Sequence, residues 1–392
     1  MLRRPATLSL PALLLLGVAV LVWLPFLGEA PNRLLSGQGV TLATLGAHAS
    51  APWWLATGVA TALLALACLW PQLGRLPLWS ALSALATLFF CFLLLAGARA
   101  QELDVVTQGL GRTALGSGFW VVVLVMWLLA HEVLRQLQAR LVHKVVWWAL
   151  VLLGTVGLLA SGLLDSLSTL KEYAARDEDF WRALAQHLRI IGYTVLLTVC
   201  TGLPLGVWVH RTPVWSQRIF PLLNMVQTIP SIALFGVLMA LLAWLGALIP
   251  LLPAWGIHGV GMAPAVLALT LYSLLPLVRS VHAGLGHIPA DIRESALAMG
   301  LSRAQLLWQI ELPLALPVVL AGLKVMLVQT IGLTAVAALI GAGGLGSLMF
   351  EGLFSSALDL VLLAVVPIVV LAWLAQALFM ALDLVVRQPV RN

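Results

Sequence analysis

The chain carries one segment of very definite pattern, residues 282–313, which read HAGLGHIPADIRESALAMGLSRAQLLWQIELP. Pro289 suits the first turn of a helix, and Gly300 suits its end, because glycine accepts the left-handed backbone conformation. Ser302 and Gln305 have the spacing of a capping box, in which each side chain accepts a hydrogen bond from the backbone N–H of the other residue. The segment therefore predicts two short helices joined by a glycine turn.

This helical hairpin (residues 282–313) offers an apolar surface. Ile292, Ala296 and Met299 recur at helical spacing, which predicts that they share one face of the first helix. Pro313 is expected to end the second helix. The hairpin can be interpreted as a DNA-reading helix–turn–helix, as a loop that packs only on its own neighbours, or as a docking element for a partner. The DNA-reading interpretation is the weakest, because the hairpin has few basic residues and apolar segments flank both of its ends.

The rest of the chain is dominated by apolar residues. Of 392 residues, 62% are hydrophobic and 9% are charged, with a mean hydropathy of +1.06. Soluble domains have about 45–50% apolar and about 25% charged residues, so a soluble enzyme is excluded and an all-α polytopic membrane protein is predicted. The net charge of +6 does not indicate a nucleic-acid partner, because the charges are scattered between apolar segments. The three cysteines lie inside such segments and are interpreted as buried thiols.

Ten segments are long and apolar enough for a bilayer core, which takes about 20 residues per helix. Because Arg3 and Arg4 precede the first, a secretory signal peptide is an alternative there, but the long apolar run favours a membrane span. The expected spans are residues 8–27, 53–70, 78–97, 118–133, 145–164, 190–209, 220–241, 262–281, 314–340 and 358–385.

The positive charges predict the orientation of these spans. With the N-terminus in the cytoplasm, thirteen of the 21 Lys and Arg residues fall in cytoplasmic segments and seven fall in outer segments. The positive-inside rule then predicts a multi-pass protein of the cytoplasmic membrane with both termini in the cytoplasm. The helical hairpin lies between the eighth and ninth spans, so it is expected on the cytoplasmic side.

The chain is expected to divide into three parts. Residues 1–164 form a five-span region without a chemical motif, residues 165–189 form a charged, partly helical outer linker, and residues 190–392 form a second five-span region that carries the helical hairpin. An internal repeat would favour an inverted-repeat secondary transporter, and none is recognisable by eye.

The helical hairpin resembles the EAA loop of ABC-importer permeases. Glu294-Ser295-Ala296, Gly300 and Ile310-Glu311-Leu312-Pro313 match that loop in residue type and spacing, and Ser295 in place of an alanine is the one departure. The resemblance implies that the hairpin is a coupling helix seated in a groove of an ATP-hydrolysing subunit. The residues that it assigns to ATPase coupling are Glu294, Ser295, Ala296, Met299, Gly300, Ile310, Leu312 and Pro313.

Three further motifs look like the glycine betaine/choline/carnitine branch of these permeases, which takes up osmoprotectants. They are QTIPS at 227–231, YSLLP at 272–276 and IGAGGLG at 340–346. The resemblance covers residues 190–385 and implies a five-helix ABC-importer permease core there. The five N-terminal spans are not part of that core and are similar to those of longer osmoprotectant permeases of Gram-negative bacteria.

The resemblance also implies partners. These are two ABC ATPase subunits that hold ATP and Mg, a second permease subunit (identical or related), a periplasmic solute-binding protein and the membrane lipid. The sequence has no G-x-x-x-x-G-K-[ST] loop, so no cofactor is expected on this chain. The expected function is a non-enzymatic permease of the bacterial inner membrane that moves glycine betaine or a related osmoprotectant into the cell.

The alternative function is an ion-coupled secondary transporter of a small solute. Such a transporter favours an intramembrane carboxylate, because a charged group in a span marks an ion path. No Asp or Glu lies in the middle of the seventh, eighth or ninth expected span, so the ATP-driven function is preferred.

Polar residues inside the expected spans are candidates for a translocation path, because a polar group in hydrocarbon is costly unless it faces water or a partner. Pro230 additionally frees a carbonyl one turn earlier in its helix. Packing of helices through small and hydroxyl side chains is an equally good interpretation. The candidates are Asn224, Gln227, Thr228, Pro230, Ser231, Tyr272, Gln329 and Thr330.

Two patterns that resemble cofactor or metal motifs lack the necessary context. Residues 341–346 satisfy G-x-G-x-x-G but follow an apolar helix instead of a strand, so a flexible or tightly packed turn at the outer gate is expected. His131-Glu132 begins like a zinc-protease motif, but Arg135 stands where the second histidine would be, so no metal site is expected. The glycines of the turn are Gly341, Gly343, Gly344 and Gly346.

Overall fold

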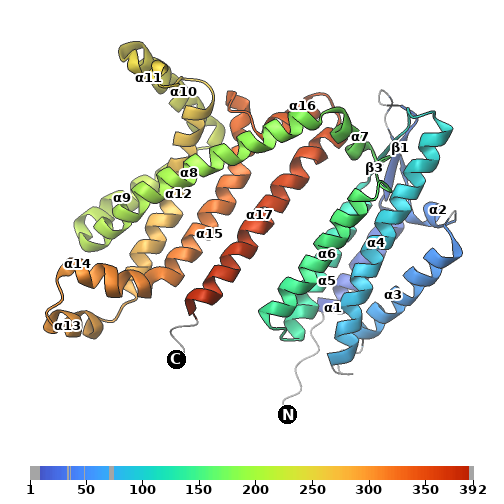
Figure 1. The fold of residues 1–392 in the computed structure, drawn as a ribbon, viewed down its shortest axis with the longest axis horizontal. Helices are drawn as coiled ribbons and strands as arrows, with labels where there is room; N and C mark the ends of the chain where they lie inside the picture. Colours follow the sequence, from blue (N-terminus) through green and yellow to red (C-terminus); the bar gives the residue numbers. More distant parts are fainter. Residues whose placement is uncertain (1–8, 33–34, 36, 48, 70–74, 388–392) are drawn as a thin grey trace. The chain divides into compact units, whose positions relative to one another are not determined.

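The computed structural model describes residues 9–32, 35, 37–47, 49–69 and 75–387. Over these residues the protein is mostly helical (Figure 1). The backbone separates into two compact units, one ending at Ala175 and the other beginning at Arg176. This break falls inside residues 165–189, the segment expected as a linker. The segment is divided between two helices: α7 (Ser168–Ala175) is the last helix of the first unit, and α8 (Asp177–Arg211) is the first helix of the second.

Nine helical segments among the described residues are long and apolar enough to cross a bilayer, which confirms a polytopic all-α membrane protein. The first expected span differs, because α1 (Ser9–Trp23) has 15 residues and a bilayer core takes about 20. The signal-peptide alternative depends on Arg3 and Arg4, which lie outside the described residues. The nine segments are Ala51–Leu69, Arg75–Val106, Ser117–Gln136, Leu141–Ala160, Asp177–Arg211, Ser231–Leu248, Met262–Gly286, Arg303–Ile340 and Leu358–Asp383.

The seventh expected span is two helices, so the prediction of one continuous helix over 220–241 is wrong. Helix α9 (Pro213–Thr228) ends before Ile229, and α10 (Ser231–Leu248) begins after Pro230. Ile229 and Pro230 are extended, with ψ of 129° and 136°. Proline disfavours the helical conformation in the residue before it and lacks an N–H donor, so the chain breaks there instead of bending.

In the first unit, α4 packs against both α3 and α5. The Phe26 side chain is fully buried and makes edge-to-face contacts with Phe92 and Phe119, with ring centroids 5.3 and 5.6 Å apart. These rings join the loop after α1 to the helices around it. The remaining helices of this unit are α2 (Leu42–Gly46), α3 (Ala51–Leu69), α4 (Arg75–Val106), α5 (Ser117–Gln136) and α6 (Leu141–Ala160).

A small antiparallel sheet at one end of the first unit was not predicted. Strand β1 (Leu27–Ala30) lies between β2 (Gln38–Val40) and β3 (Arg112–Leu115), and Leu27 is opposite both Val40 and Leu115. Strands of three or four residues are too short to show the alternation that marks a strand in a sequence.

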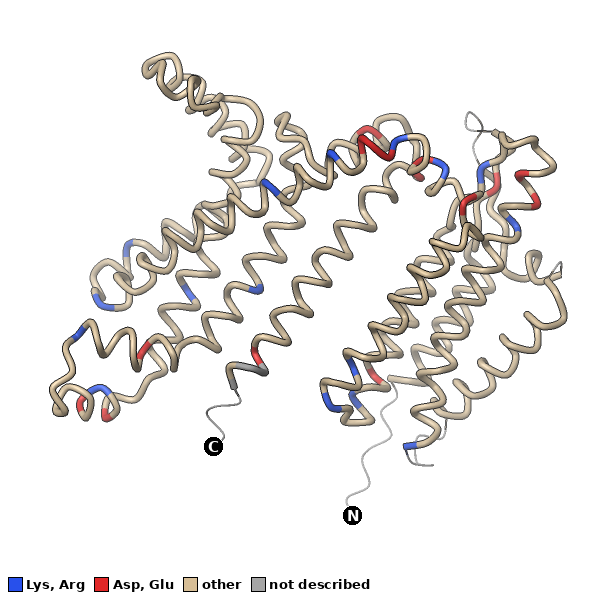
Figure 2. Tube along the Cα trace, in the orientation of Figure 1, with Lys and Arg blue, Asp and Glu red and all other residues tan. Residues whose placement is uncertain are grey.

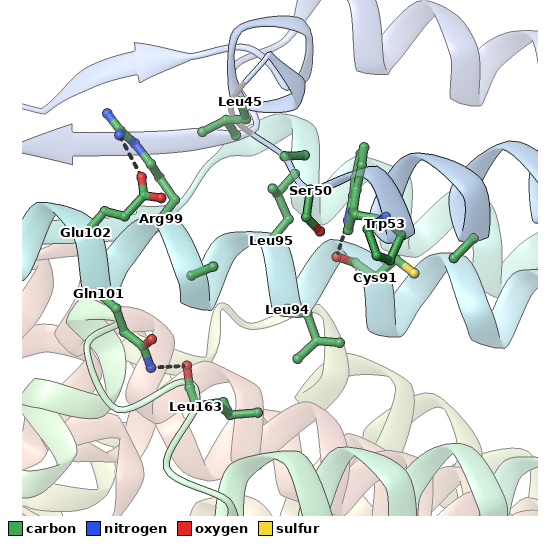
Figure 3. Close-up of a pocket in the computed structure, with 14 residues that line it drawn as sticks. Leu45, Ser50, Trp53, Cys91, Leu94, Leu95, Arg99, Gln101, Glu102 and Leu163 are labelled. Carbon is green, nitrogen blue, oxygen red and sulfur yellow. Dashed lines mark hydrogen bonds and ion pairs between the residues drawn. The ribbon is translucent and has the colours of Figure 1, made fainter.

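An open cavity of about 550 Å³ lies between α3 and α4 at the same end (Figure 3). Inside it, the Trp53 indole N–H donates to the Cys91 carbonyl at 2.9 Å. At its rim, Arg99 contacts both oxygens of Glu29 at 2.8 and 3.0 Å and one oxygen of Glu102 at 3.1 Å. The apolar part of α4 therefore ends at a charged cluster.

In the second unit, α12 (Met262–Gly286) is the central helix and packs against both α8 and α15 (Leu312–Val336). Gly202 and Gly206 of α8 permit this close approach, because a Cβ on them would lie 2.9 and 2.6 Å from Leu277 and Val281 of α12. The other elements are α11 (Leu251–Ala254), α13 (Ala290–Ala298), α14 (Arg303–Leu306), the π-helical turn η2 (Leu307–Glu311), the 3-10 turn η3 (Ala337–Ile340), α16 (Leu345–Phe354) and α17 (Leu358–Arg387).

Charged residues gather at the helix ends of each unit, and the stretches between them are mostly uncharged (Figure 2). In the second unit, α13 and α14 lie at one end with the C-terminal end of α8, and α16 lies at the opposite end (Figure 1). The helical hairpin and the glycine turn are therefore at opposite ends of the second unit.

Candidate functional site

The structure confirms the helical hairpin with its glycine turn. Gly300 has φ of +86°, and its N–H donates to the Leu297 carbonyl, while the Leu301 N–H reaches back to Ala296. This pair of hydrogen bonds closes α13 in the manner of a Schellman motif. The expected capping box starts α14: the Ser302 N–H donates to Gln305 Oε1 at 2.9 Å, and the Gln305 N–H donates to Ser302 Oγ at 3.3 Å.

The prediction that Pro313 ends the second helix is wrong. The chain continues from α14 through the π turn η2 into α15, and Pro313 lies in the first turn of α15. Proline is tolerated there because the wider π turn has already shifted the hydrogen bonding from i→i+4 to i→i+5. The hairpin is thus continuous with the following membrane span.

The three apolar residues expected on one face of α13 do not share an environment. Met299 and Ile292 are 72% and 37% exposed, whereas Ala296 is 1% exposed and faces inward. The outward surface of the hairpin instead includes Leu297 and Trp308, which are 46% and 70% exposed. The apolar side chains available to a partner are therefore Ile292, Leu297, Met299 and Trp308.

The other predicted coupling residues lie on or near this surface. Glu294, Ser295, Gly300 and Pro313 are exposed, and the side chains of Ile310 and Leu312 are half-buried. The structure thus brings the predicted coupling residues together in one short region, with Ala296 supporting it from inside.

A buried carboxylate beneath the hairpin was missed by the sequence analysis. The Glu311 side chain is 7% exposed and lies between two arginines: its Oε1 is 3.0 Å from Arg293 Nε, and its Oε2 is 3.5 Å from Arg211 Nη2. Arg293 belongs to α13 and Arg211 to the end of α8, and Arg293 also donates to the Leu285 carbonyl at the end of α12. An acidic residue between Ile310 and Leu312 was the available signal.

Aromatic rings extend this cluster. His210 Nε2 lies 3.4 Å from Arg293 Nη2, and the His210 ring is 5.4 Å from the ring of His282. The His282 ring in turn makes an edge-to-face contact with Phe220 of α9, with centroids 5.2 Å apart. The base of the hairpin is therefore joined to α8, α9 and α12.

Two candidate path residues meet at the break between α9 and α10. Gln227 Nε2 donates to the Tyr272 carbonyl at 2.8 Å, and the Tyr272 hydroxyl donates to the Ile229 carbonyl. Because Pro230 has no N–H, this break leaves backbone groups that need partners, and α12 supplies them. The carbonyl one turn before Pro230, at Val226, accepts from the Ile229 N–H at 3.3 Å, and the Tyr272 hydroxyl of α12 satisfies the Ile229 carbonyl.

A second pair of polar residues lies between α12 and α15. The hydroxyls of Ser273 and Thr330 are 2.9 Å apart, and both residues are buried. Thr330 also donates to the Met326 carbonyl at 2.8 Å within its own helix. These contacts fit helix packing through hydroxyl groups. Ser273 was not among the predicted residues, although it lies in the quoted motif at 272–276.

The remaining path candidates are dispersed. Asn224 accepts a hydrogen bond from Arg279 at 3.0 Å, and Thr228 donates to the Met225 carbonyl at 2.7 Å. Pro230 is exposed, and Ser231 and Gln329 are half-buried. The structure therefore connects Gln227 with Tyr272 but does not gather all eight candidates in one place.

The glycine turn at the opposite end is tightly packed. Gly341, Gly343 and Gly344 have φ of +77°, +78° and +82°, a region that residues with a Cβ rarely adopt. Gly346 is needed for another reason, because a Cβ there would lie 1.9 Å from the Ala335 carbonyl oxygen. The Gln186 amide of α8 holds the turn by donating to the Ala342 carbonyl at 3.1 Å.

Comparison with known proteins identifies the second unit. The family described as "Binding-protein-dependent transport system inner membrane component" matches residues 199–392. The osmoprotectant import permease protein OsmW of Salmonella typhimurium is 38% identical over 197 residues, which are 49% of this chain and 86% of OsmW. This chain belongs to that permease family. It is accordingly a multi-pass inner-membrane component of an ABC importer.

Other relatives confirm the osmoprotectant branch of the family. The glycine betaine/carnitine/choline permease protein OpuCD of Bacillus subtilis is 35% identical over 210 residues, 51% of this chain and 83% of OpuCD. The glycine betaine/proline betaine permease protein ProW of Escherichia coli is 30% identical over 192 residues, 49% of this chain and 50% of ProW. Apart from these relatives, a solved structure of the inward-facing MetNI methionine ABC transporter has a chain that matches 53% of this chain and 96% of its own length, with 22% identity and a TM-score of 0.45.

The first unit has a match of its own. Residues 5–170 match the family described as "ABC transporter permease YehY, N-terminal domain". The permease family and this N-terminal family therefore divide the chain near the break between its two units.

Proposed function

We propose that this chain is the membrane-spanning subunit of an ATP-driven importer for glycine betaine or a related osmoprotectant. The helical hairpin carries the proposal, because it presents Glu294, Gly300 and Met299 at one end of a permease core. The substrate class is supported by relatives whose names specify osmoprotectant, glycine betaine, carnitine or choline transport. The chain is a transporter subunit without chemistry of its own.

In this proposal, ATP and Mg are held by two ABC ATPase subunits that dock on the hairpin. A ligand shifts a conformational equilibrium only by its differential affinity for the two states, so ATP acts on this chain through the docked surface alone. Closure of the ATPases on ATP displaces the hairpin, and the spans change from an inward-open to an outward-open arrangement. The exposed Met299, Leu297 and Trp308 are the apolar side chains that the ATPase groove would cover.

Two further partners complete the proposed importer. A periplasmic binding protein delivers the solute at the end of the core that carries the glycine turn. A second permease subunit, either another copy of this chain or a related chain, supplies the other wall of the path. Many large apolar side chains of α8 and α10 are exposed, among them Leu196, Trp208 and Trp244, and they would face lipid or this second subunit.

The proposed orientation places the hairpin and both termini in the cytoplasm, which requires α1 to be a tenth crossing besides the nine longer segments. Arg211 in the last turn of α8 and Arg293 on α13 lie at the hairpin end of the second unit, whereas the first turn of α8 is acidic. This arrangement agrees with the positive-inside rule. Among the path candidates, Gln227 and Tyr272 are proposed to act together, because they share the break between α9 and α10.

Reconstituted uptake tests the proposal. The chain is co-expressed with ATPase subunits and the binding protein from neighbouring genes, reconstituted in liposomes, and supplied with labelled glycine betaine, choline or carnitine. ATP-dependent uptake of at least one of these is expected, and uptake should vanish when the ATPases are omitted. Uptake by this chain alone, driven by a Na⁺ or H⁺ gradient without ATP, would instead support the secondary-transporter alternative and overturn the proposal.

A further inference from the structure

The carboxylate of Glu311 connects helices that the local turns of the hairpin do not connect. Each of its oxygens faces a different arginine, with Arg293 on α13 and Arg211 at the end of α8. Arg293 reaches a third element, because it also donates to the Leu285 carbonyl of α12. One side chain thus lies where α8, α12, α13 and the π turn meet.

Burial distinguishes this contact from an ordinary surface ion pair. The Glu311 side chain is 7% exposed and that of Arg293 is 28% exposed, whereas the exposed pair of Arg182 and Asp179 on α8 has side chains 72% and 55% exposed. Exposed pairs contribute little, but the removal of one partner from a buried pair leaves a charge without compensation. The two arginines therefore differ in their hold on Glu311, because the Arg293 side chain is 28% exposed and 3.0 Å away, whereas that of Arg211 is 43% exposed and 3.5 Å away.

The backbone at Glu311 is suited to movement. Glu311 is the last residue of the π turn η2, which lies between α14 and α15. Single π turns inside α-helices are uncommon and occur often at functional sites. Pro313 follows within two residues and supplies no N–H to the helix, so the hydrogen bonding here is weaker than in a regular helix. When the hairpin is displaced, the π turn can deform, or it can pass the displacement on to α15.

The hairpin does not need Glu311 in order to fold. Gly300 closes α13 through bonds within the hairpin, and Ser302 with Gln305 opens α14 in the same local way. Loss of Glu311 would therefore leave the hairpin folded and would remove the carboxylate that links α13, the end of α8 and the π turn, while the contact of Arg293 with His210 of α8 would remain.

We propose that Glu311 is a positioning residue that transmits displacement of the hairpin to α8 and α15 through Arg211 and Arg293. The inference rests on the proposed function and adds to it the route by which the docked ATPases move the spans. It also predicts a specific defect: without Glu311, the ATPases still dock and hydrolyse ATP, but hydrolysis no longer moves solute.

The test compares Glu311→Gln with wild type in the reconstituted importer, with labelled glycine betaine as the probe and with uptake and ATP hydrolysis measured on the same liposomes. Glu311→Gln is expected to reduce uptake at least tenfold and to leave ATP hydrolysis within twofold of wild type. The control is Glu132→Gln, which removes a 13% exposed carboxylate paired with Arg135 in the first unit, and it should retain both activities.

Two further variants guard against a purely structural effect. Arg211→Met frees only the α8 side and leaves Glu311 paired with Arg293, so it should fold and show an intermediate loss of uptake per ATP. The conservative variant Glu311→Asp keeps a carboxylate between the two arginines and should recover at least a third of wild-type uptake. Hydrogen exchange should increase at residues 307–311 in Glu311→Gln and stay unchanged at residues 290–298.

The outcomes are distinct. If Glu311→Gln retains wild-type uptake per ATP, the positioning role is overturned. It is overturned equally if Glu311→Gln loses ATP hydrolysis and uptake together and Glu311→Asp restores neither. If the wild-type importer itself shows no ATP-dependent uptake of any tested solute, the proposed function fails instead.

Discussion

Replacement of Gly346 by alanine should force α15 and α16 apart. A Cβ at Gly346 would lie 1.9 Å from the Ala335 carbonyl oxygen and 2.7 Å from its carbonyl carbon. Both are backbone atoms, so no side-chain rotation relieves the contact. To reach an ordinary van der Waals distance of 3.4 Å, the two helices would have to separate by about 1.5 Å at this point.

The energetic cost follows from the packing around this contact. Leu345 is fully buried and Leu348 is 5% exposed, so a separation of α16 would loosen both side chains. Overpacking of a well-packed core costs about 1–3 kcal/mol, and a clash with backbone places Gly346→Ala near the upper end, at about 3 kcal/mol. For a domain of this size, 1 kcal/mol lowers the melting temperature by about 2–4 °C, so a decrease of about 6–12 °C is expected.

The assay is the change in tryptophan fluorescence on heating the purified protein in detergent, at one fixed scan rate because unfolding of such proteins is often irreversible. The matched control is Gly332→Ala in α15, where a Cβ would meet nothing within 4 Å. That control should melt at or slightly above the wild-type temperature, because alanine is the better helix former by about 1 kcal/mol. If Gly346→Ala melts within 2 °C of wild type, the close approach of α15 and α16 is not as described.

Three further variants test the hairpin and the break between α9 and α10. Gly300→Pro should abolish uptake but not membrane insertion. The reason is that proline cannot adopt φ of +86° and lacks the N–H that bonds to the Leu297 carbonyl. Normal uptake by this variant would refute the coupling role. Glu294→Lys reverses an exposed charge on α13 and should abolish ATP-dependent uptake with unchanged melting, and unaltered uptake would count equally against coupling. Tyr272→Phe removes the hydroxyl that donates to the Ile229 carbonyl and leaves that carbonyl unsatisfied. The loss should destabilise the protein by about 1–3 kcal/mol, measured as a lower melting temperature. An unchanged melting temperature would show that the hydroxyl is dispensable.

The sequence predicted the elements whose signals are local. The apolar runs revealed most of the membrane helices, because a helix in a bilayer satisfies its own backbone groups and needs only length and hydropathy. Gly300, Ser302 and Gln305 defined the turn and the second helix start, because each acts through backbone groups a few residues away. These features require no knowledge of tertiary contacts.

The features that the sequence did not predict depend on distant residues. Pro313 was expected to end a helix, but the π turn before it allows the helix to continue. Ala296 was expected on the same face as Ile292 and Met299 but is 1% exposed, in a helix that contacts the second helix of the hairpin. Glu311 has its partners 18 and 100 residues away, at Arg293 and Arg211, so its place between Ile310 and Leu312 could draw attention to it but could not reveal the ion pairs.

The side of the membrane on which the hairpin lies decides whether cytoplasmic ATPases can dock on it. Cys68, Cys91 and Cys200 are replaced by serine, and a single cysteine is introduced as Met299→Cys, at a position 72% exposed on the hairpin. A matched protein carries Glu178→Cys, at an 88% exposed side chain in the first turn of α8. Each is labelled with a membrane-impermeant maleimide in right-side-out and inside-out vesicles.

With the hairpin in the cytoplasm, Met299→Cys is expected to be labelled only in inside-out vesicles. Glu178→Cys, at the opposite end of the unit, is expected to be labelled only in right-side-out vesicles. Added ATPase subunits should protect Met299→Cys from the maleimide. Labelling of Met299→Cys from the outside, or no protection by the ATPase subunits, would contradict the account.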